Sequence, residues 1–364
     1  MGALHPHKFY FRTKLINKMM NILISSTRQW NPGDEFIAMG VRNLLKYVFK
    51  DQKINWILYD RNPDLFVDGF SKPIHKSKIW SNVFHNHKSN CLDLAVVAGT
   101  PEWFGLPMKR FYEAVKENNI PLLLLGVGYI NYPINFSDDE LYCFKRLLKL
   151  AVVRDEYASL ALKKVGVSHE ILPCPALFAA ELALPSVEEK AKKIGFIIQT
   201  NKTANQSIPE ELVHASVWSV KELRRSGFKV DVICHYIDEF VEFSRILPPV
   251  RYSYDSADYI SIIAEYDLII STRLHGAILA NCLNKPAILL NKDSRCRGAS
   301  KLFPFIHVAN PSNLINQISK VFDLPIYNLK KWKEEVKMQY IRLLQSALEE
   351  DKNEICDQFQ NIMG

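Results

Sequence analysis

Short runs of apolar residues alternate with amphipathic segments along almost the whole chain. In the first half, runs that fit buried strands occur at 21–25, 54–59, 92–98, 121–125 and 151–153. Segments with apolar residues at helical spacing lie between or after them, at 35–49, 111–118, 138–150 and 157–165. This alternation predicts a doubly wound α/β domain built on a parallel sheet.

A polar stretch, 182–193, contains Pro185 and separates this half from a second series of alternating elements. Strands are predicted there at 194–199, 230–235, 268–270 and 287–290, and helices at 209–226, at 257–265 and after the polar corner 271–276. The charged, amphipathic segment 327–357 is expected to form a long helix, or a pair, that packs back across the molecule. We therefore expect two Rossmann-like domains facing a cleft, at 20–183 and 192–322, and then a helical segment, 323–364.

The most informative residues follow the strand predicted at 268–270. They read Ser271-Thr272-Arg273-Leu274-His275-Gly276, and a helix is expected to start among them. The N–H groups at a helix start favour anions, an arginine can hold a phosphate or carboxylate, and a histidine transfers protons near neutral pH. An ion-paired arginine with a turn-filling histidine is the alternative. The position at the carboxyl end of a strand favours a functional role.

The corner after the first strand holds several polar residues before the helix predicted at 35–49. Asn31 can cap that helix, with Pro32 at its first position. Asp34 can also face the cleft as a base or a substrate ligand, with Arg28 and Gln29 reaching polar groups of a substrate. The structural and functional interpretations are compatible, and both stay open.

Two other corners are candidate binding loops. After the strand at 92–98, Thr100, Glu102 and Trp103 can meet a sugar, with Trp103 stacking on its face and Glu102 bonding its hydroxyls. The alternative there is a turn with a surface tryptophan. The loop after 287–290 carries Arg295 and Arg297, which can join Arg273 around a multiply charged ligand or form a solvated basic loop.

Two further corners are predicted to have structural roles, one with two glycines and one with an arginine. Gly126-Val127-Gly128 lacks the third glycine of a dinucleotide fingerprint and is expected to make a tight turn. Arg154 and Asp155 follow the strand at 151–153, where a local ion pair is the expected role.

Composition and charge limit the kinds of molecule that we expect the protein to bind. The formal net charge is +7, which suits an anionic substrate or an anionic membrane surface. Nucleic acid is not expected, because no basic run interleaved with aromatics and no zinc-finger spacing occurs. The seven cysteines are scattered without a C-x-x-C pair, which favours a reducing compartment. No metal site is predicted, since His85 and His87 have no further ligand at suitable spacing.

The location of the protein is expected to be cytoplasmic. The longest apolar run, 120–130, is too short to span a bilayer and is broken by proline and glycine. Residues 1–20 have no apolar core of a secretory signal. They are basic and contain aromatic residues, so peripheral contact with the inner face of a membrane is an open alternative.

Taken together, these corners resemble those of the polysaccharide pyruvyl transferase family. The match runs through Asn31-x-Gly33-Asp34, Gly99, Gly126-Val127-Gly128, residues 153–157 and 271–276, and Lys285-Pro286. It spans most of residues 20–300, and Arg273-Leu274-His275-Gly276 is its most specific block. The chain departs from the family at Cys174, where an aspartate is usual, and at 25–28, which replace a glycine-rich loop.

The resemblance implies a fold like that of the GT-B glycosyltransferases, no metal or other cofactor, and phosphoenolpyruvate as donor. The product would be a pyruvate ketal on two hydroxyls of a sugar in a bacterial surface glycan, with a free or lipid-linked acceptor. His275 would be the acid, Asp34 the base for the hydroxyl, and Arg273 the phosphate ligand. The donor site would lie in the C-terminal domain, at Ser271, Thr272, Arg273, Leu274, His275, Gly276, Arg295 and Arg297. The acceptor site would lie in the N-terminal domain, at Arg28, Gln29, Asn31, Thr100, Glu102 and Trp103.

Two other functions are kept as alternatives. The same architecture would serve a glycosyltransferase that uses a nucleotide sugar, although no acidic ribose-binding residue is evident after the strand before Arg273. A glycan-binding protein that has lost turnover is the non-catalytic alternative, and the departure at Cys174 keeps it open.

Overall fold

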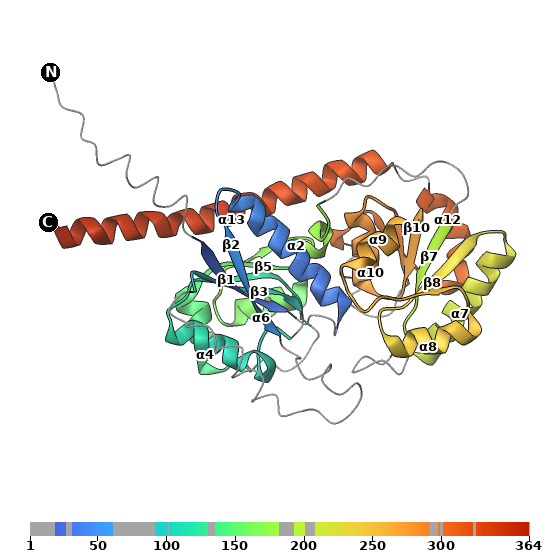
Figure 1. The fold of residues 1–364 in the computed structure, drawn as a ribbon, viewed down its shortest axis with the longest axis horizontal. Helices are drawn as coiled ribbons and strands as arrows, with labels where there is room; N and C mark the ends of the chain where they lie inside the picture. Colours follow the sequence, from blue (N-terminus) through green and yellow to red (C-terminus); the bar gives the residue numbers. More distant parts are fainter. Residues whose placement is uncertain are drawn as a thin grey trace, which may run out of the picture.

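The computed structural model describes two α/β domains joined by a long C-terminal helix (Figure 1). It describes residues 19–26, 31–60, 92–100, 102–129, 135–181, 193–200, 208–290, 298, 301–322 and 325–363. Their strands form two separate parallel sheets of six strands each. The predicted architecture of two Rossmann-like domains is confirmed.

The first sheet belongs to the N-terminal half of the chain, and its strands run in the order β2-β1-β3-β4-β5-β6. They are β1 (Met20–Ser26), β2 (Ile54–Asp60), β3 (Leu94–Thr100), β4 (Leu122–Val127), β5 (Leu148–Val153) and β6 (Glu170–Ile171). Every residue of β4 is buried, as expected for a central parallel strand covered on both faces. The strand order reverses between β1 and β3, and ligands of such sheets bind beyond the carboxyl ends at this switch point.

The helical elements of the first domain are α2 (Pro32–Val48), η3 (Leu106–Met108), α4 (Lys109–Glu117), α5 (Asp138–Tyr142), η4 (Cys143–Leu147), α6 (Glu156–Lys164) and η5 (Pro175–Phe178). Helix α2 follows β1, starts beside the second domain, and buries apolar residues along its length, among them Phe36, Ile37 and Val41. These side chains share one cluster of buried residues with Ala277 and Ile278 of the second domain, so the domains have a continuous apolar contact.

The second sheet has the order β12-β11-β10-β7-β8-β9. Its strands are β7 (Lys193–Ile197), β8 (Lys229–Ile233), β9 (Val250–Arg251), β10 (Leu268–Ser271), β11 (Ala287–Leu290) and β12 (Ile306–Ala309). Its helical elements are α7 (Glu210–Arg225), α8 (Ile237–Ile246), α9 (Asp258–Ala264), α10 (Leu274–Cys282), η6 (Pro311–Asn313) and α12 (Leu314–Phe322). The order reverses between β7 and β10, so the switch point lies directly before α10.

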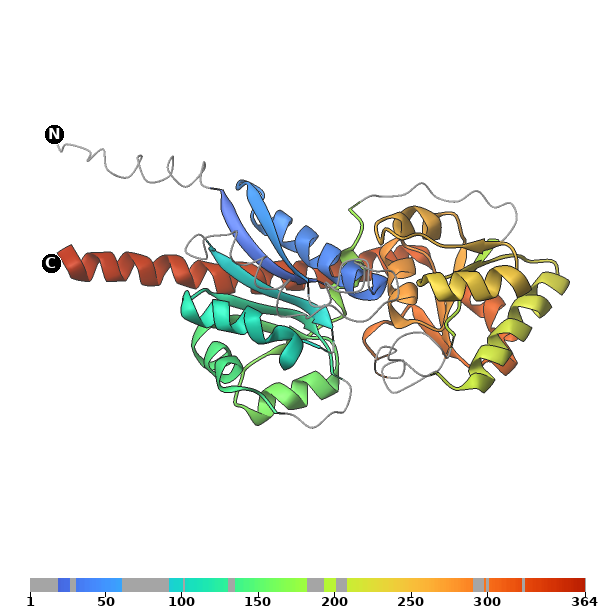
Figure 2. The ribbon, with the colours of Figure 1, turned by 60° about the horizontal axis from the view of Figure 1, so that its bottom comes forward.

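Helix α13 (Ile326–Met363) connects the two domains from outside. Figures 1 and 2 both show it running beside the second domain and then beside the first. The Nζ of Lys333 donates to the carbonyl of Cys282 in the second domain over 2.8 Å, and the hydroxyl of Tyr340 donates to the carbonyl of Pro173 in the first over 2.9 Å. The predicted return of the C-terminal segment is confirmed, as one helix and not a pair.

Several elements differ from the sequence-based prediction. The helix expected at 138–150 ends earlier: after α5 comes a π-helical turn, and β5 begins at Leu148. Apolar residues at 147–150 fit either periodicity, and pairing of Leu148 with Leu122 of β4 decides for a strand. Helix α8 was not predicted, since exposed Ile237 and Val241 blur its apolar face. The two-residue strands β6 and β9 are too short for a pattern to reveal.

The helices of the described ranges were also assessed as membrane spans. None of them combines the length and the apolar character that crossing a bilayer requires.

Candidate functional site

Helix α2 starts at the switch point of the first sheet. The side chain of Asn31 accepts a hydrogen bond from the backbone N–H of Gly33 over 3.1 Å, and Pro32 takes the first helical position. Asp34 stands in the first turn with only 5% of its surface exposed. The capping role predicted for Asn31 is therefore present, and Asp34 lies buried at the end of the helix that faces the second domain.

The turn from β10 into α10 is built by Ser271 and Thr272. The hydroxyl of Ser271 donates to the carbonyl of Arg273 and accepts from its N–H, over 2.7 and 2.9 Å. The N–H of Thr272 donates to the carbonyl of Ile197 on the neighbouring strand β7. A Cβ on Gly276 would lie 2.4 Å from the Ile197 side chain, so only glycine lets α10 start this close to the sheet.

His275 is where the two switch points meet. A Cβ on Gly33 would lie 2.4 Å from the Nδ1 atom of His275, so the imidazole rests directly on the first turn of α2. On its other side, Nη1 of Arg154 lies 3.0 Å from Nε2 of His275. Because a guanidinium can only donate, Nε2 accepts this bond, and a neutral ring then carries its proton on Nδ1. Three elements, α2, β5 and α10, thus converge on one imidazole.

Arg154 follows β5 and crosses to the second domain. Its surface is 8% exposed, and Gly128 leaves room for it, since a Cβ there would lie 2.4 Å from Nε. Cys174 approaches its Nη1 at 3.8 Å. Burial opposes the charge of the guanidinium, but Cys174, Asp155 and Asp34 favour it and the pKa of Arg154 is raised. The arginine therefore stays a cation beside a proton-carrying ring.

The predicted local ion pair of Arg154 with Asp155 is only partly correct. Asp155 does contribute to its charge, but the carboxylate of Asp155 accepts backbone N–H groups of Ala158 and Tyr129 over 2.8 and 3.1 Å. The guanidinium of Arg154 is thereby directed to His275 in the other domain. The sequence indicates a local pair at this corner and gives no sign of this contact between the domains.

Arg273 lies in a separate buried cluster. One of its terminal nitrogens is 2.5 Å from the carboxylate of Glu239, and its guanidinium lies 4.7 Å above the ring of Tyr236. Glu239 also accepts the backbone N–H groups of His235 and Tyr236. Burial opposes the charge of Arg273, while Glu239 and Tyr236 favour it and the pKa of the guanidinium is raised. Arg273 is thus held by an acid, as the alternative interpretation of this corner predicted, although the sequence did not identify Glu239 as the partner.

His235, at the end of β8, adjoins this cluster. Its ring packs edge-on against Phe36 of α2 and Tyr259 of α9, with centroids 6.0 and 5.0 Å away. Burial, and next Arg273, lower the pKa of His235 well below its ordinary value. Among the described residues, nothing hydrogen-bonds its Nε2. The ring is therefore a neutral part of the contact between the domains.

The position of Trp103 contradicts one part of the predicted acceptor site. Trp103 is fully buried, and its Nε1 donates to the carbonyl of Gly128 over 2.9 Å. The hydroxyl of Tyr112 donates to the backbone carbonyl of Trp103. A side chain enclosed in this way has no face open to a sugar, so the predicted stacking role is wrong, as is the alternative of a surface tryptophan. Glu102 is exposed, and Thr100 is the last residue of β3.

Of the other predicted site residues, some come together in the structure and some lie outside the described residues. Asp34 and His275 come together around Arg154, with Leu274 and Gly276 next to them on α10. The predicted contributors outside the described residues are Arg28, Gln29, Arg295 and Arg297. Their roles stay predictions.

Metal binding was examined over the part of the chain that the structure describes. No group of three or more histidine, cysteine, aspartate or glutamate residues with the geometry to hold an ion occurs there. His85 and His87 lie outside this part.

The fold and this site define the class of protein. Two Rossmann-like domains meet at the carboxyl ends of their sheets, with a histidine of one against the first helix of the other, and this is a GT-B-like enzyme architecture. Residues 31–294 match the model of the polysaccharide pyruvyl transferase family, and the chain belongs to this family. A comparison with curated proteins gave no match.

Solved structures show the same fold at low identity. The UDP-GlcNAc 2-epimerase from Neisseria meningitidis bound to UDP-GlcNAc is 12% identical with a TM-score of 0.54, over 88% of this chain and 100% of that one. A putative UDP-N-acetylglucosamine 2-epimerase from Listeria monocytogenes is 10% identical with a TM-score of 0.57, over 89% and 91%. The ADP-heptose lps heptosyltransferase II of E. coli is 14% identical with a TM-score of 0.50, over 83% and 98%.

Proposed function

We propose that the protein transfers a pyruvyl group from phosphoenolpyruvate to two hydroxyls of a sugar in a bacterial surface polysaccharide, forming a pyruvate ketal. The contact of Arg154 with His275 at the first turn of α2 carries the proposal. It brings a permanent cation, a proton-transferring ring and a helix N-terminus together at the switch points of two sheets.

The donor fits this chemistry through its charges. Phosphoenolpyruvate carries a phosphate and a carboxylate, and arginine and helix N-termini bind both. Arg154 is the first phosphate ligand in this proposal, because the contacts of its Nη1 within the described part of the chain are the ring of His275 and the thiol of Cys174. Arg273 is bound to Glu239 and comes second. If Arg154 turns to the phosphate, Nε2 of His275 is free to take up a proton from solvent, and the protonated ring is then the acid of the reaction.

The reaction balances with two acid–base residues and no cofactor. His275 gives a proton to the methylene carbon of the donor, which makes C2 electrophilic, and the first sugar hydroxyl adds to C2 as Asp34 takes its proton. The bond from C2 to the phosphate oxygen then breaks, and the second hydroxyl closes the ketal with loss of its proton. Of the two hydroxyl protons, one ends on the new methyl group and the other leaves with phosphate.

The test measures phosphate release from phosphoenolpyruvate in the presence of a panel of sugars with neighbouring hydroxyls, free and lipid-linked. Release with a matching ketal by mass spectrometry is expected, and His275→Asn and Arg154→Met should each slow it by about 100-fold or more. Arg146→Met, at an exposed arginine, is the control that keeps turnover. Full turnover in both site variants would overturn the assignment.

A transferase that uses a nucleotide sugar is the alternative enzyme. The epimerase of the same fold from N. meningitidis was solved bound to UDP-GlcNAc, which makes nucleotide sugars the proper comparison. Thermal unfolding with phosphoenolpyruvate and with a panel of nucleotide sugars separates the two. Stabilisation by phosphoenolpyruvate, reduced in Arg154→Met, is expected; stabilisation by a nucleotide sugar alone would favour the alternative. We place the reaction in the cytoplasm, with an acceptor at the inner face of the membrane as one option.

A further inference from the structure

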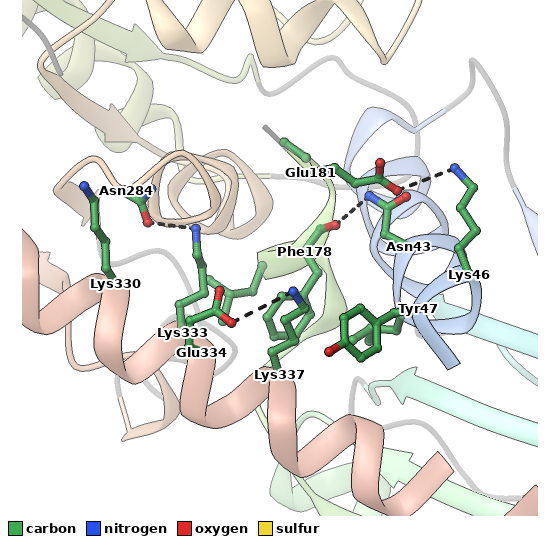
Figure 3. Close-up of a pocket in the computed structure, with 13 residues that line it drawn as sticks. Asn43, Lys46, Tyr47, Phe178, Glu181, Asn284, Lys330, Lys333, Glu334 and Lys337 are labelled. Atoms are coloured by element: carbon green, nitrogen blue, oxygen red, sulfur yellow. Dashed lines mark hydrogen bonds and ion pairs between the residues drawn. The ribbon is translucent and has the colours of Figure 1, made fainter. Parts of the chain in front are cut away.

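A cavity lies on the α13 side of the molecule, between the two domains (Figure 3). Its volume is about 620 Å³, within the range of pockets that hold small organic ligands. The carboxyl-terminal half of α2, the segment from η5 to Glu181, Asn284 after α10, and α13 form its walls. Both connections between the domains thus border the cavity, since Glu181 leads into the segment 182–192 and α13 crosses back.

Lysines dominate the charge of this cavity. Lys330, Lys333 and Lys337 line it from one side of α13, and Lys46 from α2. The acids among the lining residues are Glu181, 3.6 Å from Lys46, and Glu334, 3.9 Å from Lys337. Four cations against two anions leave a net positive cavity, which favours an anion with about two negative charges.

Lys333 is the most enclosed of these lysines. Its Nζ donates to the carbonyl of Cys282 and to the side chain of Asn284, over 2.8 and 2.7 Å. An ammonium group has three N–H donors, so one remains beyond these two bonds. Burial lowers the pKa of Lys333; Cys282 and Glu334 oppose this effect, and Lys337 and Lys330 add to it. A bound anion would favour the charged form of this partly buried ammonium group.

The cavity also has an apolar side. Leu177 and Phe178 of η5 line it, and the half-exposed ring of Tyr47 lies 5.0 Å from Nζ of Lys337. Figure 3 shows Tyr47 and Lys337 projecting toward each other from α2 and α13. Such a surface accepts the organic part of a ligand, and an aromatic ring can stack on tyrosine.

We propose that this cavity binds a nucleotide-sized phosphate ester, with its phosphate on the α13 lysines and its planar part against Tyr47. The cavity is separate from the proposed catalytic site but linked to it by two helices. Helix α2 has Gly33 at His275 and Tyr47 at the cavity; α10 has His275 at its start and is followed by Asn284 at the cavity.

The test uses titration calorimetry with adenosine monophosphate and with inorganic phosphate at constant ionic strength. We expect both to bind, the nucleotide more tightly. The double substitution Lys330→Gln with Lys337→Gln should weaken both by about tenfold or more, because two contacts to the phosphate are lost. The control pair Lys320→Gln with Lys331→Gln removes the same charge from exposed positions outside the cavity and should bind normally.

Two further variants separate this site from the catalytic one. Tyr47→Ala should weaken the nucleotide but not inorganic phosphate, and Arg154→Met should leave nucleotide binding intact. The result holds whether or not phosphoenolpyruvate is the donor, since no turnover is measured. No heat of binding at millimolar nucleotide, equal loss in the control pair, or loss in Arg154→Met alone would overturn the proposal.

Discussion

At the scale of single residues, the site separates two arginines that the sequence presents as similar. Arg154 meets a neutral imidazole and a thiol, whereas Arg273 is bound to the buried carboxylate of Glu239. A guanidinium in a direct ion pair of this kind contributes less to binding a phosphate than Arg154, on which Asp155 and Asp34 act as neighbouring charges while its Nη1 contacts the ring and the thiol. We therefore give the donor phosphate to Arg154 and a supporting role to the pair of Arg273 with Glu239.

Glu239→Gln tests how much the pair of Arg273 with Glu239 contributes to stability. The substitution leaves the buried guanidinium of Arg273 without a negative partner, and the free energy of unfolding should fall by about 3 kcal/mol. Urea denaturation measures it. Adding Arg273→Met to Glu239→Gln should restore part of the loss, because the unpaired charge is then removed. A double variant whose loss equals the sum of both single losses would show that the two residues do not act as a pair.

His235 predicts a pH dependence of stability. Burial, and then Arg273, lower its pKa in the folded protein, so the unfolded chain binds the proton first as pH falls. The stability contributed by the neutral ring is complete above about pH 6.5 and declines below it, by about 1.4 kcal/mol per pH unit. His235→Phe should remove this part of the slope, measured by denaturation from neutral to mildly acidic pH. The exposed His214, changed to Gln, should keep it; equal slopes in wild type and His235→Phe would contradict the account.

At the scale of elements, two helix starts opposed across the domains make the site. The N-terminus of α2 and the N-terminus of α10 come together at Gly33 and His275, and β5 delivers Arg154 between them. Their distance depends on the absent side chain of Gly33. Small residues at this contact therefore set the catalytic geometry more directly than the strands do.

Gly33→Ala tests this dependence. The new methyl group would lie 2.4 Å from Nδ1 of His275 and push the ring away, and a displacement of this kind should lower turnover by about 100-fold. The free energy of unfolding should also fall, by about 1–3 kcal/mol, because the methyl group overpacks a buried contact. Gly298→Ala, where an added Cβ meets no atom within 4 Å, is the control. Normal turnover in Gly33→Ala would show that the contact is not part of the site.

The helices and strands could be predicted from the sequence more completely than the contacts between side chains of different elements. Helix α2, strand β10 and the start of α10 follow from periodicity and capping residues such as Asn31, since these are local signals. The contact of Arg154 with His275 joins residues 121 positions apart, and nothing in the chain indicates that distance except the rule that strand ends carry ligands. Burial of Trp103 was also missed, because its partners Gly128 and Tyr112 belong to other elements.

At the scale of the whole molecule, α13 holds the two domains together. It contacts the second domain through Lys333 and Trp332 and the first through Tyr340, whose ring packs 5.9 Å from Phe178. A segment outside both sheets thus helps to determine how the two switch points face each other, and its Tyr340 lies near Cys174 and Arg154. Helix α13 is also the wall that gives the lysine-lined cavity most of its charge.

Tyr340 is the residue of α13 best suited to test that role. Tyr340→Ala removes a fully buried ring and should lower the free energy of unfolding by about 4 kcal/mol. Tyr340→Phe removes only the bond to the carbonyl of Pro173 and should cost about 1 kcal/mol. Tyr327→Ala, at a position 75% exposed on the same helix, is the control for thermal unfolding. Equal stability of the two alanine variants would contradict an anchoring role for Tyr340.

The most direct test of the account is a crystal structure of the protein with phosphoenolpyruvate bound. We expect the donor between the domains, with a phosphate or carboxylate oxygen about 3 Å from the guanidinium of Arg154 and its methylene carbon facing His275. Phosphoenolpyruvate bound away from both residues, in crystals where this contact is accessible to solvent, would contradict the central claim.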